Sequence, residues 1–345
     1  MSFYCGIDLS ARDSHVCVID HQLARLIDQK VKNDLQLIIS LLEPYKHDLR
    51  IVVESTFNWY WLVDGLRAAD FQVCLAHTLG LFMITGAKVK TDRRDAFSLA
   101  KLLLAGVIPG AYIYPPEQRP VRDLLRQRLL LVQRRAELYG RISRLLLREG
   151  IIDASRREIT ELSESELEQY FSHPLLQLYV SQELERISLY SEQITELEQA
   201  ILARAQSQSA FARLQQVYGI GPVLALTILY EVGEVSRFEN VRHFCSYCRV
   251  VPGLAQSGSV SKRGRGSKQG NHYLKWAFSQ AAVHAVRCSP QVRRCFERHV
   301  NRRRGRGRRA VAYGIIAHKL AQAVYYVMSE ESEFHEQWLF GSSGS

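Results

Sequence analysis

Short apolar runs of strand length recur over the first third of the chain. Residues 3–7, 15–19 and 23–31 form three such runs in succession, and residues 50–54 and 71–76 form two more. Apolar runs of this length, bounded by polar and turn-forming residues, predict β-strands. The first three follow one another closely enough to form a meander.

Amphipathic stretches separate the later runs. After Asn33, a suitable N-cap residue, apolar side chains recur at helical spacing. These apolar residues are Leu35, Ile38, Ile39 and Leu42. Further helices are predicted at 59–69 and 93–104. The resulting β-β-β-α-β-α-β order, followed by one more helix, predicts a mixed sheet with helices on its faces.

The apolar period lengthens to seven after the two prolines at 115 and 116. One heptad stripe comprises Leu124, Leu131, Leu138 and Leu145, and a second comprises Val180, Ile187, Ile194 and Ile201. Two long helices with this pattern predict an antiparallel hairpin or an oligomer-forming coiled coil. Two core helices of an ordinary bundle are an equal alternative.

A mainly helical unit is predicted after residue 208, with a loop at 250–259. Its helices are expected at 223–232, 242–249, 271–285 and 310–328. The predicted fold class is therefore α/β plus α, with domains at 1–115, 116–208 and 209–340. The last five residues, 341–345, resemble an appended Gly/Ser linker.

The composition is that of an ordinary globular protein with a basic surplus. Among 345 residues, 45 Lys and Arg stand against 35 Asp and Glu, which gives a formal charge of +10. Hydrophobic residues make up 47% of the chain, which is enough for a sizeable core and excludes a wholly disordered protein. The seven Cys are an odd number, and neither a secretory signal nor a membrane-spanning apolar run is visible. We therefore expect a reduced, cytoplasmic protein with no membrane partner.

The charge is concentrated in three segments. Residues 119–148 hold nine Arg and two acidic residues, residues 158–198 hold ten Glu and one Arg, and residues 262–309 hold fifteen Lys and Arg and one Glu. A single basic run is usually solvated surface, but two runs around an aromatic, apolar helix favour a nucleic-acid partner. The Arg-rich and Glu-rich helices could instead pair with each other.

Four carboxylates stand at the ends of predicted elements. Asp8 follows one buried strand, Glu54 ends another, and Asp92 and Asp95 lie three residues apart at the start of a helix. A carboxylate at the end of a buried strand is costly unless it is paired or binds a cation. If the sheet places Asp8 beside Glu54, the four could bind Mg²⁺, and two such ions could serve phosphodiester transfer. Each acid taken alone is more often structural.

Several motifs resemble those of a known family. Gly6-Ile-Asp8, Val53-Glu-Ser55 and residues 90–96 (Lys-Thr-Asp-Arg-Arg-Asp-Ala) resemble the carboxylate motifs of RuvC-type, RNase H-like nucleases. Residues 252–258 (Pro-Gly-Leu-Ala-Gln-Ser-Gly), with 268–271 (Lys-Gln-Gly-Asn), resemble the second block of the DEDD transposases of bacterial insertion sequences. These transposases are the bridge-RNA-guided recombinases.

The resemblance implies a fold, a site and partners. It implies an RNase H-like nuclease domain whose Mg²⁺-binding tetrad is Asp8, Glu54, Asp92 and Asp95. Ser257 is then the nucleophile that joins covalently to DNA, with Ser259 and Ser261 as rival candidates. The partners implied are donor and target DNA, a structured bridge RNA, and further copies of the chain in dimers and tetramers. A serine ester conserves the energy of the phosphodiester, so strands can be rejoined without ATP.

We expect the basic and polar residues around both motifs to bind nucleic acid. They are Lys88, Lys90, Arg93, Arg94, Lys262, Arg263, Arg265, Lys268, Asn271 and Lys275. Residues 119–148 and the N-terminal domain are expected to take RNA, and residues 262–309 to border DNA near Ser257. Neutralising Arg263 and Arg265 should weaken DNA cleavage and its salt tolerance together.

Two other functions stay open on the sequence. A hydrolytic RuvC-like nuclease, such as a Holliday junction resolvase, would use water as its nucleophile and leave Ser257 as a turn residue. A non-catalytic scaffold for RNA or DNA would use the carboxylates only for structure. An ATP-driven mechanism is disfavoured, because the chain has no Gly-x-x-x-x-Gly-Lys-Ser/Thr loop.

Three Cys and His pairs have spacings that suggest zinc. They are Cys245 with Cys248, His284 with Cys288, and Cys295 with His299. None of the pairs forms a complete zinc-knuckle pattern. We interpret the cysteines as thiols of the core.

Overall fold

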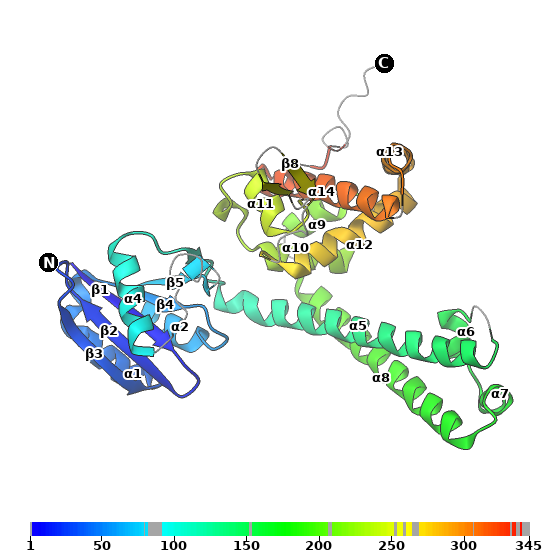
Figure 1. The fold of residues 1–345 in the computed structure, drawn as a ribbon, viewed down its shortest axis with the longest axis horizontal. Helices are drawn as coiled ribbons and strands as arrows, with labels where there is room; N and C mark the ends of the chain where they lie inside the picture. The colour runs from blue at the N-terminus through cyan, green and yellow to red at the C-terminus, as the bar shows by residue number, and fades with distance from the viewer. Residues whose placement is uncertain are drawn as a thin grey trace, which may run out of the picture. The chain divides into compact units, whose positions relative to one another are not determined.

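The computed structural model describes most of the chain. The described residues are 2–78, 80–81, 92–151, 154–205, 209–251, 254–257, 260–263, 269–305, 307–331, 333–335 and 339, with the backbone alone for 92–94, 205, 254–257 and 260–263. The chain divides into two compact units, Met1–Pro116 and Glu117–Ser345 (Figure 1). Each unit is described by itself below.

The first unit is built on a mixed sheet of six strands in the order β3-β2-β1-β4-β5-β6. The strands are β1 (Phe3–Leu9), β2 (Asp13–Ile19), β3 (Arg25–Lys32), β4 (Leu49–Glu54), β5 (Gln72–Ala76) and β6 (Gly110–Ala111). The first three form an antiparallel meander, β1, β4 and β5 run parallel, and β6 is antiparallel to β5. This mixed sheet confirms the predicted strand order and is consistent with an RNase H-like fold.

Helices cover both faces of this sheet. On one face, α1 (Leu35–Leu42) and α2 (Tyr60–Ala68) bury residues such as Ile38 and Leu62 against Ile7 and Val53. On the other face lies α4 (Asp92–Leu104) (Figure 1). Its Ala96 and Ala100 cluster with Cys17 and Ile19 of the sheet. Because both faces are covered, the central strands are apolar along most of their length.

The N-cap of α1 differs from the prediction. Asp34, and not Asn33, caps the helix by accepting hydrogen bonds from the amides of Gln36 and Leu37. The side chain of Asn33 instead accepts from Ser14 Oγ at 2.6 Å. Both residue types are good caps, so only the backbone path decides which of two neighbours takes the position.

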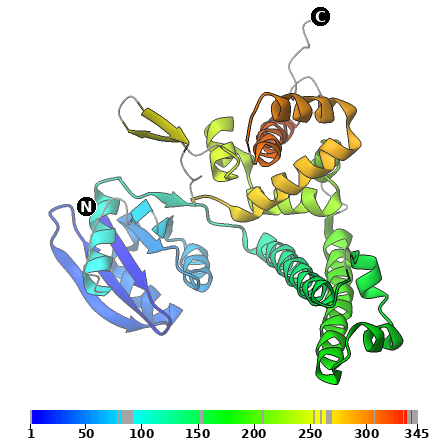
Figure 2. The same cartoon turned by 45° about the vertical axis from the view of Figure 1, so that its right-hand side comes forward.

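The second unit begins with an antiparallel helical hairpin. It comprises α5 (Arg119–Arg148) and α8 (Pro174–Ala205), joined through α6 (Arg156–Thr160) and α7 (Glu164–Tyr170). Val121 near the start of α5 clusters with Ile201 near the end of α8, while Ile142 clusters with Val180. Figures 1 and 2 show the two long helices side by side. The hairpin is thus the arrangement adopted, and a supercoiled or oligomeric coiled coil stays a prediction.

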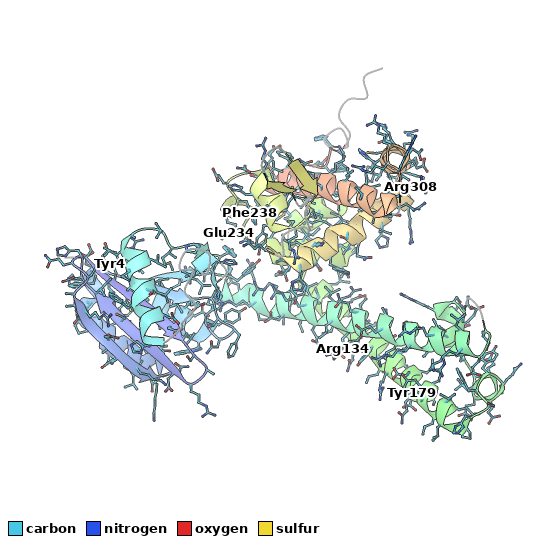
Figure 3. The ribbon with its side chains drawn as sticks, viewed as in Figure 1. Tyr4, Arg134, Tyr179, Glu234, Phe238 and Arg308 are labelled. Carbon is cyan, nitrogen blue, oxygen red and sulfur yellow. The ribbon has the colours of Figure 1, made fainter. Side chains whose placement is uncertain are left out.

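The Arg-rich and Glu-rich helices pair with each other in part. Arg128 bonds to Glu198 at 2.6 Å, Arg135 to Ser191 at 2.9 Å, and Arg141 lies 3.6 Å from Glu183. Three further arginines of α5 are exposed, namely Arg134, Arg144 and Arg148, and Figure 3 labels Arg134. Only part of this basic segment is therefore exposed to an outside partner.

The rest of the second unit is a helical bundle with a small hairpin. Its helices are α9 (Ser209–Gln215), α10 (Pro222–Val232), α11 (Val241–Tyr247), α12 (His272–Cys288), α13 (Pro290–Asn301) and α14 (Arg308–Ser329). The sequence missed α13, although Ser289 caps it, Pro290 opens it, and Val292, Phe296 and Val300 are buried at helical spacing. The predicted loop at 250–259 was also wrong in part, because β7 (Leu254–Ser257) pairs with β8 (Val260–Arg263).

None of the helices in the described part of the chain is both long and apolar enough to cross a membrane.

Candidate functional site

Asp8 and Glu54 follow paired residues on adjacent parallel strands. Ile7 of β1 pairs with Val53 of β4, so the two carboxylates are the next residues along the two strands. Because side chains alternate across a sheet, Asp8 and Glu54 belong to the same face. Both are half-buried. Two carboxylates thus stand side by side at one end of the sheet.

That face is the one covered by α4. A Cβ at Gly6 would meet the backbone oxygen of Ala96 at 2.1 Å, so the helix rests directly on β1 two residues before Asp8. The far end of α4 lies near the start of β1 (Figure 1), and Leu104 packs against the same cluster as Tyr4. Figure 3 labels Tyr4 next to this helix. The helix therefore runs antiparallel to β1 and starts at the Asp8 end.

The start of α4 carries the other two acids of the expected tetrad. Asp95 is half-buried and directly precedes Ala96, and Asp92 opens the helix one turn earlier, with only its backbone described. Among the described side chains, which leave out Asp92, no three Asp, Glu, His or Cys converge in a way that could hold a metal ion. The tetrad therefore stays a prediction, supported by the backbone positions.

A histidine that the sequence did not single out lies beside Asp8. His15 of β2 is the cross-strand partner of Asp8 in the antiparallel register. Its Nε2 lies 2.8 Å from Asp28, which also accepts from Arg25 at 2.6 Å. His15 is only 9% exposed, so this contact fixes the orientation of its ring. The period-two pattern of β2 could have placed His15 on this face, but not next to Asp8.

Ser257 ends β7 in the small hairpin. It pairs with Val260, whereas Ser261 pairs with Gln256. By strand alternation, positions 257 and 261 therefore belong to opposite faces of the hairpin. The third candidate, Ser259, lies outside the described residues. The register thus separates two of the rival nucleophiles by face.

The predicted nucleic-acid-binding residues fall into three groups. Lys88, Lys90, Arg265 and Lys268 lie outside the described residues, and Arg93, Arg94, Lys262 and Arg263 are described in backbone only. Lys275 is exposed on α12. Asn271 is only 8% exposed, and its side chain caps α12 by accepting from the amides of Tyr273 and Leu274. The structure gives Asn271 a structural role, and its contact with nucleic acid stays a prediction.

The cysteines near α11 lie in the apolar core. Cys245 and Cys248 are fully buried in the main cluster of the second unit, and Cys295 is buried in the same cluster. Burial raises the pKa of Cys245 to about 12 and raises the pKa of Cys248 well above its ordinary value. Cys288 is exposed.

Comparisons with known proteins identify the family. Residues 5–150 match the DEDD transposase family model named for IS110, and residues 211–297 match the model described as the transposase IS116/IS110/IS902 family. Together the two matches contain Asp8, Glu54, Asp92, Asp95 and Ser257.

The relatives include named transposases. The chain is 30% identical to a putative transposase, y4qE, of Sinorhizobium fredii over 57% of this chain and 48% of the relative. It is 26% identical to the transposase for insertion sequence element IS1328 of Yersinia enterocolitica over 95% of this chain and 97% of the relative. It is also 25% identical to the pilin gene-inverting protein of Moraxella bovis over 81% and 82%.

The chain spans about half to two thirds of the length of the relatives with the strongest matches. The two family models nevertheless cover both the carboxylate-bearing unit and the serine-bearing region in the same order along the chain. The chain belongs to the IS110 family of transposases.

Proposed function

We propose that this protein is a DNA transposase that cuts and rejoins strands through Ser257, with a divalent metal ion held by Asp8, Glu54, Asp92 and Asp95. The observation that carries the proposal is the placement of Asp8 beside Glu54 on the face where α4 begins. Carboxylates brought together in this way can be stabilised further by binding a cation.

The donor set fits Mg²⁺. All four side chains offer hard oxygen ligands, which Mg²⁺ prefers, and Asp8, Glu54 and Asp95 are half-buried, so solvent and substrate can reach them. When bound, the metal would stabilise charge on the attacking and leaving oxygens of a phosphodiester. Asp8 and Glu54, fixed by strand pairing, would hold their oxygens in place before substrate arrives.

Ser257 supplies the covalent step. Its Oγ forms a bond to phosphorus while the bond from phosphorus to the leaving-strand oxygen breaks. The hydroxyl proton of Ser257 passes to solvent, and the departing strand oxygen takes up a proton. In the reverse step a strand hydroxyl attacks the phosphoserine and frees Ser257. The number of phosphodiester bonds is conserved, so no ATP is needed.

We further propose that a structured bridge RNA selects the DNA. The exposed arginines of α5, including Arg134, Arg144 and Arg148, offer a sequence-independent surface for an RNA backbone. Base pairing would then read the target, while the protein reads shape and phosphate.

We propose assembly through dimers into a tetramer. The carboxylates belong to the first compact unit and Ser257 to the second, so one active site can be completed by two chains. This arrangement would couple cleavage to assembly, because an isolated chain would lack a paired serine and metal.

The test is trapping of a covalent adduct. Protein purified without nuclease treatment is incubated with labelled DNA and Mg²⁺ and run on a denaturing gel, and the bound RNA is sequenced. We expect an adduct in the wild type, none in Ser257→Ala, and a retained adduct in Ser261→Ala, which lies on the other face of the hairpin. Asp8→Asn should lose the adduct without losing RNA binding.

Other outcomes point to other functions. Free DNA ends without an adduct would indicate a hydrolytic nuclease or junction resolvase. Full transposition by Asp8→Asn in cells would indicate structural carboxylates and a nucleic-acid-binding scaffold. Strand exchange retained in Ser257→Ala would show that another group is the nucleophile.

A further inference from the structure

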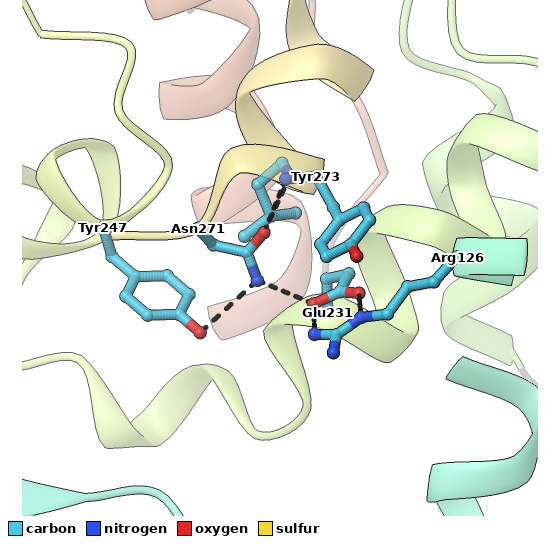
Figure 4. Close-up of polar contacts among 6 residues, drawn as sticks. Arg126, Glu231, Tyr247, Asn271 and Tyr273 are labelled. Atoms are coloured by element: carbon cyan, nitrogen blue, oxygen red, sulfur yellow. Dashed lines mark hydrogen bonds and ion pairs between the residues drawn. The ribbon is translucent and has the colours of Figure 1, made fainter. Parts of the chain in front are cut away.

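Helix α10 carries a buried, hydrogen-bonded carboxylate that takes no part in the proposed chemical steps. Glu231 is 1% exposed, one residue before the end of a helix whose other side chains are almost all apolar. Its Oε1 accepts from Arg126 Nε at 2.6 Å, and its Oε2 accepts from Arg126 Nη2 at 2.8 Å (Figure 4). Two parallel bonds of this kind fix the carboxylate geometrically.

The same carboxylate also holds Asn271. Asn271 Nδ2 donates to Glu231 Oε2 at 2.7 Å, while Asn271 Oδ1 accepts from the amides of Tyr273 and Leu274 at the start of α12. The nitrogen of the Asn271 amide therefore binds Glu231, and its oxygen caps α12. Glu231 sets which way the amide faces, because only the nitrogen end can donate to a carboxylate.

Asn271 closes the loop that carries Ser257. Its backbone N–H donates to the carbonyl of Tyr247 at 2.6 Å, and its Nδ2 lies 3.5 Å from the Tyr247 hydroxyl. Tyr247 ends α11, and Asn271 precedes α12, so this contact joins the two ends of the serine segment, residues 248–270. The two ends of the segment are therefore held together at its base.

Arg126 connects the base of the segment to the helical hairpin. Its guanidinium lies 4.5 Å from the centre of the Tyr273 ring in addition to binding Glu231. Burial acts to lower the pKa of Arg126, but the hydrogen bonds and charge of Glu231 outweigh it, and the pKa is raised. The guanidinium of Arg126 therefore keeps its positive charge beside Glu231.

We infer that Glu231 is a positioning residue for strand cleavage: through Asn271 it holds the base of the serine segment, and through Arg126 it ties that base to α5. The inference rests on the proposed role of Ser257. Because Glu231 is buried, its effect is transmitted through Asn271 and the cap of α12. A shift of about 1 Å at the reacting atom can cost on the order of 100-fold in rate.

The experiment compares cleavage with binding in the full chain loaded with RNA. In Glu231→Ala we expect adduct formation to slow on the order of 100-fold, while the Kd for DNA and for RNA stays within about threefold. Glu231→Gln keeps an oxygen that can accept from Asn271 and should recover much of the rate. Rates are measured below the thermal midpoint of each variant.

A double variant tests whether slow cleavage results from a misplaced serine segment or from lower stability of the fold. Replacing a buried ion pair with apolar residues often preserves stability, so Arg126→Met with Glu231→Leu should remain folded. It still lacks the acceptor for Asn271, and its cleavage should stay as slow as in Glu231→Ala. Recovery of wild-type cleavage by this double variant would overturn the inference.

Glu183 offers a matched control. It is also 1% exposed and bonds to Arg186 at 3.0 Å. It lies in α8, a helix that contributes none of the residues that hold the base of the serine segment. Glu183→Ala removes a comparable buried charge and should leave the cleavage rate of folded protein unchanged. An equal loss in both alanine variants would show that the effect is general destabilisation.

Hydrogen exchange tests the positioning role of Glu231 independently of the proposed covalent step. If the wild type forms no adduct at all, the role of Ser257 fails, but Glu231→Ala should still speed exchange at the amides of Tyr273 and Leu274 and at those of β7 and β8. Unchanged exchange at these amides would overturn the positioning role by itself.

Discussion

Gly270 lies directly against the backbone carbonyl of Tyr247. A Cβ at position 270 would stand 2.5 Å from that oxygen, and the φ of Gly270 is +97°. The absence of a side chain is what allows the neighbouring Asn271 amide to reach the same carbonyl at 2.6 Å. The base of the serine segment thus depends on one glycine.

Gly270→Ala should therefore destabilise the second unit. The added methyl must displace the Tyr247 carbonyl, and the alanine backbone must keep an unfavourable φ. We expect a loss of at least about 2 kcal/mol in the free energy of unfolding. Gly305 has a φ of +93° with no atom within 4 Å of its Cβ position. In Gly305→Ala only the backbone angle is unfavourable, and we expect the free energy of unfolding to fall by about 1 kcal/mol. Equal losses in the two variants, measured by chemical denaturation, would contradict the close contact.

Gly6→Ala should disturb the first unit in the same way. A Cβ there would meet Ala96 O at 2.1 Å and Ala100 N at 2.7 Å, so α4 must move away from β1. We expect a loss of at least about 2 kcal/mol in stability. If Asp95 binds the metal as proposed, activity should also need more Mg²⁺, because Asp95 moves with the helix. Gly110→Ala, with nothing within 4 Å, is the control and should stay within about 0.5 kcal/mol.

Arg249→Gly should stabilise the protein. Arg249 has a φ of +56° just after α11, a position where glycine avoids the steric cost of a side chain. We expect a gain of about 0.5 kcal/mol, after allowing for the greater freedom of glycine in the unfolded chain. Asp70, with a φ of +60° after α2, should gain less from the same change, because Asp tolerates this conformation better. Thermal denaturation of both variants provides the measurement, and a destabilised Arg249→Gly would show that the arginine side chain contributes packing.

The cysteines should differ sharply in reactivity. Burial raises the pKa of Cys245 to about 12, so its thiol stays protonated and shielded at pH 8. Cys288 is exposed and should react with a maleimide within minutes, while Cys245 and Cys248 should react only after unfolding. Mass spectrometry of native and denatured protein measures the difference. Fast native labelling of Cys245, or stoichiometric zinc in purified protein, would contradict the interpretation as core thiols.

The starts of α6 and α7 each have a capping box, formed by Ser155 with Glu158 and by Ser163 with Glu166, and both should weaken in acid. Hydrogen bonds from Ser155 lower the pKa of Glu158, and those from Ser163 lower the pKa of Glu166. A carboxylate whose folded pKa is lowered stabilises the fold above its unfolded pKa, and that contribution disappears as the pH falls through the lowered value. Amide exchange at the starts of α6 and α7 should therefore accelerate below about pH 4. In a variant with Glu158→Gln and Glu166→Gln, this acid-dependent acceleration should be absent at both caps.

Local pattern was sufficient for most of the elements. Strand alternation and helical spacing placed β1 to β5, α1, α2 and α4, because both periods are set by neighbouring residues along the chain. The helix α13 was missed although Ser289 and Pro290 mark its start. The β7–β8 hairpin was missed because four-residue strands carry too little periodicity to distinguish them from a loop.

Glu231 shows why the site could be predicted only in part. Its one visible signal was a lone carboxylate inside an apolar helix, and nothing in the sequence connects it with Arg126, 105 positions earlier, or with Asn271, 40 positions later. Asn271 was assigned to nucleic acid because it lies near a basic loop. Its burial and its role as a helix cap depend on where α10 and α12 meet.

The sequence by itself determined most of the strands and helices, the segregation of charge, and the four carboxylates and one serine that define the resemblance, since these depend on residue type and local spacing. The tertiary structure decided that Asp8 stands beside Glu54 and His15, that α4 begins at this end of the sheet, and that Glu231 holds the base of the serine segment. These relationships join residues far apart in the chain. They arise from strand register and helix packing, which buried surface and paired polar groups fix only when the whole unit folds.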